Sequence, residues 1–255
     1  MWLGPGRHLD RSFSCGIVFH EATLESLAAI ASAPLNTISD VIAAFSAIEE
    51  FLPAGDGLKW FNWLYLQVTN AVDGSVGTGQ WNNPEWLTRL DVVFAGLYLD
   101  SLAKPAPKCW QVLLDARHDL RLARIQFALA GMNAHIDHDL SIAVTQTCRE
   151  FAIAPVHLSP QYQDYCRVND LLDAIVEAAK KELLVGLLGD PLPCLQLVEN
   201  LAAAWGLRGT REVAWTNAEL LWHAQSIPGL AERFLDSLDT TAALAGRGLL
   251  APVGI

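Results

Sequence analysis

The sequence predicts an all-α fold, a single-domain bundle of about eight helices around an aromatic-rich apolar core or cavity. In its apolar segments hydrophobic residues recur at the i, i+3, i+4 and i+7 spacing of a helix face, and no stretch alternates as a strand does. Hydrophobic residues make up 52% of the 255 residues, which include nine Trp and nine Phe. We therefore expect one α-helical domain over residues 1–255, with an irregular lead-in at 1–20 and a tail at 246–255.

Helix-breaking residues divide this pattern into elements. Ser39-Asp40 are predicted N-cap residues, Ser159 and Pro160 begin a later helix, and the glycines between Asp73 and Pro84 predict the main loop. The segment 108–148 is long for one globular helix, so a break is expected at Gly131. The predicted helices span 21–32, 39–52, 58–70, 85–102, 108–148, 159–188, 192–206, 210–225 and 229–245.

Charge and composition exclude several classes of function. The net charge is −11 without a Lys/Arg cluster, which argues against nucleic-acid binding. No apolar run approaches the roughly 18 residues of a membrane span, and the N-terminus lacks the pattern of a signal peptide. The five cysteines form no C-x-x-C pair, so reduced thiols and a cytoplasmic location are expected. The sequence leaves a homodimer open.

The densest group of polar residues lies inside the apolar segment around residue 135. His135, His138 and Asp139 share one helical face at i, i+3 and i+4, while Asn133 and Asp137 lie four apart on another. The first three suit either a Zn²⁺ or Fe²⁺ site or a general acid–base pair in which Asp139 or Asp137 orients an imidazole. A buried polar network that only fixes helix packing is the structural alternative.

Other polar residues on apolar helices are candidates for the wall of a cavity that binds an apolar small molecule. Tyr65 and Thr69 lie four apart, near Trp63, on the helix predicted at 58–70. Asp91 interrupts an otherwise apolar stripe and is a second catalytic candidate. Arg124 lies three turns before His135 on nearly the same face, where it would meet an anionic end of a substrate.

A third polar group, Asn169, Asp173 and Glu177, follows one stripe at i, i+4 and i+8. It resembles the second metal motif of class I terpene synthases, Asn/Asp-Asp-Leu-x-Ser/Thr-x-x-x-Glu, with Asp173 in place of the hydroxyl residue. The resemblance implies that these three residues bind Mg²⁺ against a diphosphate. In a cyclase, Asp139 is a further candidate ligand for the metal. It implies also a diphosphate-sensing role for Arg124. The chain lacks the Asp-Asp-x-x-Asp motif of that family. The alternative is a solvated helix face, on which the acidic residues pair at i, i+4 with lysines such as Lys180 and Lys181.

A wider resemblance covers most of the chain. It rests on Asp-Gly-Leu-Lys-Trp-Phe-Asn at 56–62, on Leu90-Asp91, on Gly-Met-Asn-Ala-His-Ile-Asp-His-Asp-Leu at 131–140 and on Val168-Asn169. Together these resemble an uncharacterised, largely actinobacterial, all-helical family with the hallmark Asn-Ala-His-Ile-x-His-Asp-Leu. This resemblance implies the fold and the choice of site, and it implies no reaction.

Three functions follow from these patterns. The favoured one is a terpene-cyclase-like lyase of terpenoid biosynthesis, in which a divalent metal, Mg²⁺ by preference, assists ionisation of an isoprenoid diphosphate in an apolar cavity. The second is a Zn²⁺- or Fe²⁺-dependent hydrolase or oxygenase that uses His135, His138 and Asp139 as ligands. The third is a non-enzymatic binder of an apolar ligand.

Overall fold

The computed structural model describes residues 26–192 and 206–252, and within these ranges it contains helices and no strand. The predicted all-α bundle is confirmed. The lead-in predicted at 1–20 lies wholly outside the described residues. The helix predicted at 192–206 lies outside them except for its two end residues. The helices are α2 (Ile38–Phe51), α3 (Gly57–Val76), α4 (Pro84–Ala103), α5 (Lys108–Ala116), α6 (Arg124–Ala134), the π-helix η1 (His135–Asp139), α7 (Leu140–Glu150), α8 (Pro160–Leu183), α10 (Leu207–Ala224) and α11 (Leu230–Leu249).

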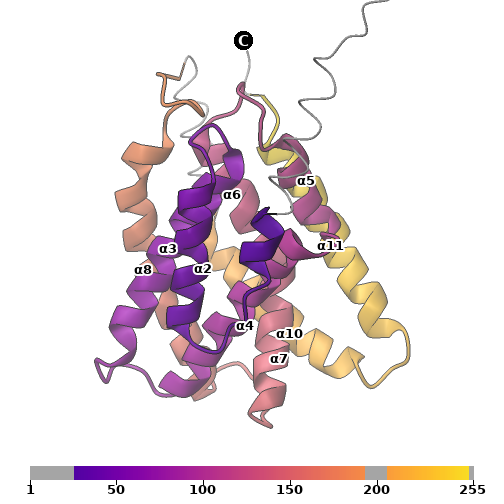
Figure 1. The fold of residues 1–255 in the computed structure, drawn as a ribbon. Coiled ribbons are helices and arrows are strands. Elements are labelled where there is room, and N and C mark those ends of the chain that lie inside the picture. The colour runs from indigo at the N-terminus through magenta and orange to yellow at the C-terminus, as the bar shows by residue number, and fades with distance from the viewer. Residues whose placement is uncertain (1–25, 193–205, 253–255) are drawn as a thin grey trace, which may run out of the picture.

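The helices pack around one apolar core, with α3 and α6 at its centre (Figure 1). Helix α3 lies against α2, α6 and α8, and α7 lies against α4 and α10. Helix α11, yellow in Figure 1, covers α5 and α6. Among the described helices, none combines the length and the apolar character needed to cross a membrane.

The segment predicted as one helix over 108–148 is interrupted at residues 117–123, not at Gly131. The cause is a tertiary contact. The Arg117 guanidinium pairs with the buried carboxylate of Asp56, the N-cap residue of α3, and the Arg117 carbonyl accepts a hydrogen bond from Gly57 N–H. The chain must leave the helix at Arg117 to make both contacts.

Gly131 instead allows α3 and α6 to approach closely. A Cβ added there would lie 2.3 Å from the Phe61 ring, far inside van der Waals contact. The glycine therefore serves packing, and the helix continues through it without a kink.

The loop between α3 and α4 is shorter than predicted, because α3 continues to Val76. Its end is fixed by Asp164 of α8, a buried carboxylate that accepts hydrogen bonds from the backbone N–H groups of Asn82 and Asn83. These contacts tie the start of α4 to α8, and so position two of the helices that surround the site.

Candidate functional site

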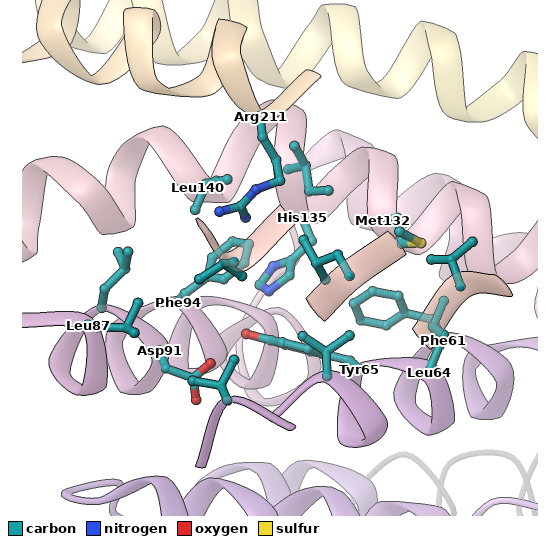
Figure 2. Close-up of a pocket in the computed structure, with 17 residues that line it drawn as sticks. Phe61, Leu64, Tyr65, Leu87, Asp91, Phe94, Met132, His135, Leu140 and Arg211 are labelled. Atoms are coloured by element: carbon teal, nitrogen blue, oxygen red, sulfur yellow. The ribbon is translucent and has the colours of Figure 1, made fainter. Parts of the chain in front are cut away.

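A cavity of about 80 Å³ lies between α3, α4, the α6–η1 segment, α8 and α10. Most of its wall is apolar, and four polar side chains, Tyr65, Asp91, His135 and Arg211, reach it (Figure 2). The apolar lining comprises Phe61, Leu64, Val68, Val72, Leu87, Leu90, Phe94, Met132, Ile136, Leu140, Val168, Leu172 and Val176. The polar residues come from four helices far apart in the sequence.

The π-helical turn η1 carries His135, which lines the cavity, and His138, which does not. Its widened hydrogen bond runs from Leu140 N–H to His135 O, an i to i+5 bond, between two regular helices. Single π turns are rare and occur frequently at functional sites. The turn brings both His135 and His138 within hydrogen-bond distance of Asp139.

Asp139 accepts three hydrogen bonds in the core. Trp110 Nε1–H donates to Oδ2 at 2.8 Å, His135 Nδ1 lies 3.0 Å from Oδ2, and His138 Nδ1 lies 2.7 Å from Oδ1. Burial raises the pKa of Asp139, but the hydrogen bonds from the two histidines outweigh it and hold the pKa below its ordinary value. The group is therefore a carboxylate at neutral pH.

This carboxylate fixes the tautomers of both imidazoles. A carboxylate only accepts hydrogen bonds, so each Nδ1 carries its proton and donates. Burial lowers the pKa of His135 despite Asp139, which leaves His135 neutral with a lone pair on Nε2. For His138 the hydrogen bond and the charge of Asp139 outweigh burial and raise the pKa, so His138 is the partner that takes the positive charge.

The His135 ring is enclosed by aromatic side chains. It stacks on Phe94 with ring centroids 3.5 Å apart and planes 6° apart, and it meets the edge of Tyr65 at 4.7 Å. Its Nε2 is buried and has no hydrogen-bond partner among the described residues. The same holds for the hydroxyl oxygen of Tyr65 and for Oδ2 of Asp91. Three polar atoms of one cavity wall therefore lack partners, which is costly unless a ligand satisfies them.

Burial also changes the proton affinity of the cavity acids. Burial, with the charge of Asp91 next in effect, raises the pKa of Tyr65 well above its ordinary value. Burial, assisted by the charge of Asp73, raises the pKa of Asp91 to about 7. The cavity thus holds a tyrosine that keeps its proton and a carboxyl group that is half-protonated near neutral pH.

Arg211 is the site residue that sequence reasoning missed. It is 5% exposed, its Nε donates to Asn169 Oδ1 at 2.7 Å, and its Nη2 donates to the Tyr165 carbonyl at 2.9 Å. A signal was present in the sequence. Arg211 lies on the buried stripe of α10, at i, i+3, i+4 and i+7 with Ala214, Trp215 and Ala218.

Other predicted residues lie away from the cavity. Trp63 packs edge-to-face on Trp60, and Thr69 is buried next to the cavity wall without lining it. Asn133 Nδ2 donates to the Ala242 carbonyl and so ties α6 to α11. Asp137, whose pKa burial raises to about 6, lines a separate surface hollow.

Arg124, predicted to bind substrate, serves the packing of α8 instead. Its Nη1 lies 2.6 Å from Glu182 Oε1, and its guanidinium covers the Trp60 ring at 3.7 Å. Its Nε donates to the Leu187 carbonyl, which fixes the turn after α8. These contacts direct the cation away from the cavity.

The stripe predicted to bind Mg²⁺ does not converge on the cavity with Asp139. The Asn169 side chain is buried against Arg211, whereas Asp173 and Glu177 are exposed. Asp173 pairs with Arg208, and Glu177 pairs with Lys180. The reason is the geometry of α8. Its buried face includes Asn169 and Leu172, and the turn of the helix places positions 173 and 177 on the exposed face.

The His–Asp face likewise differs from the predicted set of metal ligands. Both Nδ1 atoms and both oxygens of Asp139 are already engaged with one another. Within the described part of the chain, no three His, Cys, Asp or Glu side chains are placed around a common point as metal ligands. A divalent metal stays a prediction from the sequence.

Comparison with known proteins identifies the family and no reaction. No curated protein and no solved structure matches the chain. A family model described as "Family of unknown function (DUF5995)" matches residues 38–252, a range that includes every wall of the cavity. The chain therefore belongs to this family of unknown function.

Proposed function

We propose that the protein is an acid–base enzyme that removes a proton from a small, largely apolar carbonyl compound, with His135 as the base. One observation carries the proposal: Asp139 holds Nδ1 of a buried neutral histidine, while Nε2 lies unpaired at a cavity. An imidazole oriented by a carboxylate is a common general base, since the fixed tautomer presents its lone pair to the substrate.

Tyr65 and the protonated form of Asp91 supply the complementary donors. In an apolar cavity, a hydroxyl and a neutral carboxyl group stabilise an oxygen on which negative charge develops. His135 Nε2 takes the proton from the carbon next to the carbonyl, the electron pair of the C–H bond forms a C=C bond to the carbonyl carbon, and the π pair of the C=O bond moves onto the oxygen. The imidazolium then returns the proton to the same or a conjugated carbon, which restores His135.

Asp139 and His138 support this cycle without touching the substrate. Protonated His135 gains attraction to the Asp139 carboxylate, 3.0 Å from its Nδ1. Trp110 and His138 hold that carboxylate in position. Asp139 and His138 are positioning residues, and their hydrogen bonds are already formed before a substrate enters.

The cavity volume bears on the choice among the predicted functions. An apolar cavity of about 150 Å³ holds one benzene molecule, and the cavity here measures about 80 Å³. It suits a few heavy atoms. The isoprenoid cyclase stays a prediction, and its substrate would need the cavity to widen. The metal-dependent hydrolase or oxygenase also stays a prediction.

Exchange of carbon-bound hydrogen in D₂O tests the proposal without knowledge of the product. The purified protein is incubated with three- to six-carbon ketones, aldehydes, esters and 2-oxo acids, and deuterium next to the carbonyl is followed by NMR. We expect exchange with at least one compound and a loss of about 100-fold or more in His135→Gln. His157→Gln, a histidine distant from the cavity, serves as the control and keeps the rate. Exchange that is absent throughout, or equal in His135→Gln, would refute the proposal.

A further inference from the structure

Arg211 brings a positive charge to the cavity wall, and no carboxylate of the described residues pairs with it. It donates hydrogen bonds to two neutral acceptors, the Asn169 amide oxygen and the Tyr165 carbonyl, and it forms no ion pair with any described carboxylate. The guanidinium also lies over the Tyr165 ring, 4.2 Å from its centroid. Buried charges are ordinarily paired, so this arrangement leaves the cation open to an anionic partner.

The contacts of Arg211 leave one end of the guanidinium free. Nε and Nη2 are engaged, whereas Nη1 donates to no described residue. Figure 2 shows the guanidinium extending from α10 toward the space beside His135. Asn169 and the Tyr165 ring fix its plane, so the free end is held in place rather than left to rotate.

Asp91 does not neutralise this cation. The two residues belong to opposite walls of the cavity, on α4 and α10, and in Figure 2 the Tyr65 hydroxyl and the His135 ring lie between them. The cavity is therefore asymmetric, with a cation at one side and a carboxyl group of raised proton affinity at the other. A ligand with one anionic end and one neutral polar end would match both.

We propose that Arg211 binds the carboxylate of a small monocarboxylic acid whose body lies against Phe94, Leu140 and Val168. A guanidinium recognises a carboxylate by charge-assisted hydrogen bonds, and the Tyr65 hydroxyl is a further donor of the wall. A phosphate dianion would bring a second negative charge for which the described wall offers no second cation. The cavity volume sets the size of the acid at a few carbons.

The identity of the substrate rests on the proposed function, whereas binding of the carboxylate does not. If His135 is the base, the substrate is a short acid with a second carbonyl group, such as a 2-oxo or 3-oxo acid. The carboxylate then lies on Arg211 and the second carbonyl oxygen faces Tyr65 and Asp91.

Paired ligands test the binding directly. Propanoate, butanoate and hexanoate are titrated against the corresponding primary amides by calorimetry and by protein NMR. We expect the carboxylate to bind the natural protein at least about tenfold more tightly than its amide, because only the carboxylate pairs with the cation. Arg211→Gln removes this preference, and Arg208→Gln, an exposed arginine one turn earlier on α10, retains it.

Arg211→Lys covers the case in which Arg211→Gln does not fold. Lysine keeps the charge and loses the planar fork held by Asn169, so carboxylate binding weakens about tenfold while the protein stays folded. Equal binding of carboxylate and amide, no binding of any acid, or an unchanged preference in Arg211→Gln would overturn the proposal. Carboxylate binding without exchange of deuterium would leave Arg211 as the anion site and refute His135 as the base.

Discussion

Replacement of Asp139 by Asn tests the centre of the hydrogen-bond network. Asn keeps the shape and offers one oxygen and one NH₂ group in place of two oxygens. Trp110 and His135 both use Oδ2, so the amide oxygen must take that position. The NH₂ group then faces His138 Nδ1, which has to lose its proton in order to accept that hydrogen bond.

The expected loss of stability follows from the hydrogen bond between His138 Nδ1 and Asp139 Oδ1, which Asn cannot replace. A hydrogen bond to a charged group contributes about 1.5–3 kcal/mol, and removal of one partner of a buried ion pair costs about 3–5 kcal/mol. We expect Asp139→Asn to lower the free energy of unfolding by about 3 kcal/mol at pH 7. For a chain of this size that corresponds to a fall in Tm of about 6–12 °C.

Asp137→Asn is the matched control, since it removes a carboxylate from the same π turn. Burial raises the pKa of Asp137 to about 6, so a neutral amide costs little there and the Tm changes by less than about 2 °C. The reasoning is wrong if Asp139→Asn unfolds within 2 °C of the natural protein, or if both variants lose the same stability in urea and thermal unfolding.

The pH dependence of the same pair has a defined sign. The pKa of Asp139 is lowered in the folded protein, so its contribution is present above the ordinary value of 3.8 and is lost as the pH falls through the folded pKa. The stability difference between the natural protein and Asp139→Asn is therefore greatest near pH 5. It narrows below about pH 4 as Asp139 is protonated, and it narrows again as the pH rises through the folded pKa of His138, which Asp139 raises above 6.5. A difference that stays constant from about pH 3 to 9 would contradict the assignment of the charge pair to Asp139 and His138.

Three further predictions concern other parts of the molecule. Gly131→Ala, whose Cβ would lie 2.3 Å from the Phe61 ring, should lower Tm by several degrees, whereas Gly74→Ala, with no atom within 4 Å of its Cβ, should not. Asp91→Asn should become more stable relative to the natural protein as the pH rises from about 4 to 7, because the folded pKa of Asp91 is raised to about 7 and its ionisation destabilises the fold. Urea unfolding at pH 4.5 and 8 measures this. An equal difference in the free energy of unfolding at the two pH values would contradict it. For His157 burial lowers the pKa but two glutamates raise it further, so an NMR titration should give a value above 6.5, and stability lost in His157→Gln at pH 5.5 should diminish as the pH rises through that value.

Local signals predicted most helices well, because their ends depend on a few adjacent residues. Ser159 accepts the predicted N-cap hydrogen bond from Tyr162 N–H, with Pro160 in the first helical turn. The start at Ser39-Asp40 was displaced by two residues, since Thr37 is the N-cap and Asp40 completes its capping box. The predicted kind of N-cap, a small polar side chain, is correct. The hydroxyl of Thr37 accepts the capping hydrogen bond in place of Ser39, so the helix begins earlier than predicted.

Tertiary contacts set the features that the sequence did not predict. The helix break at 117–123 depends on the buried pair of Arg117 with Asp56, which lies far away in the sequence. For the site, Tyr65, Asp91 and His135 were predicted because each interrupts or extends an apolar stripe, and all three reach one cavity. Periodicity alone does not show which of two arginines points into a cavity. The sequence pattern favours Arg124 as the substrate-binding arginine, whereas Arg211 lines the cavity wall.

The π turn at 135–139 also makes the length of this segment part of the fold. Each residue of a regular helix rotates the chain by about 100°. The five residues of the π turn rotate the chain about as far as four residues of a regular helix, so all of α7 would rotate by about 100° relative to α6 if the same five residues formed a regular helix. Ser141, Val144 and Cys148, now buried, would turn outward, and Thr145 would lose its hydrogen bond to the Ala218 carbonyl. The π turn therefore takes up one residue more than a regular helix would, and so determines which face of α7 packs against α10.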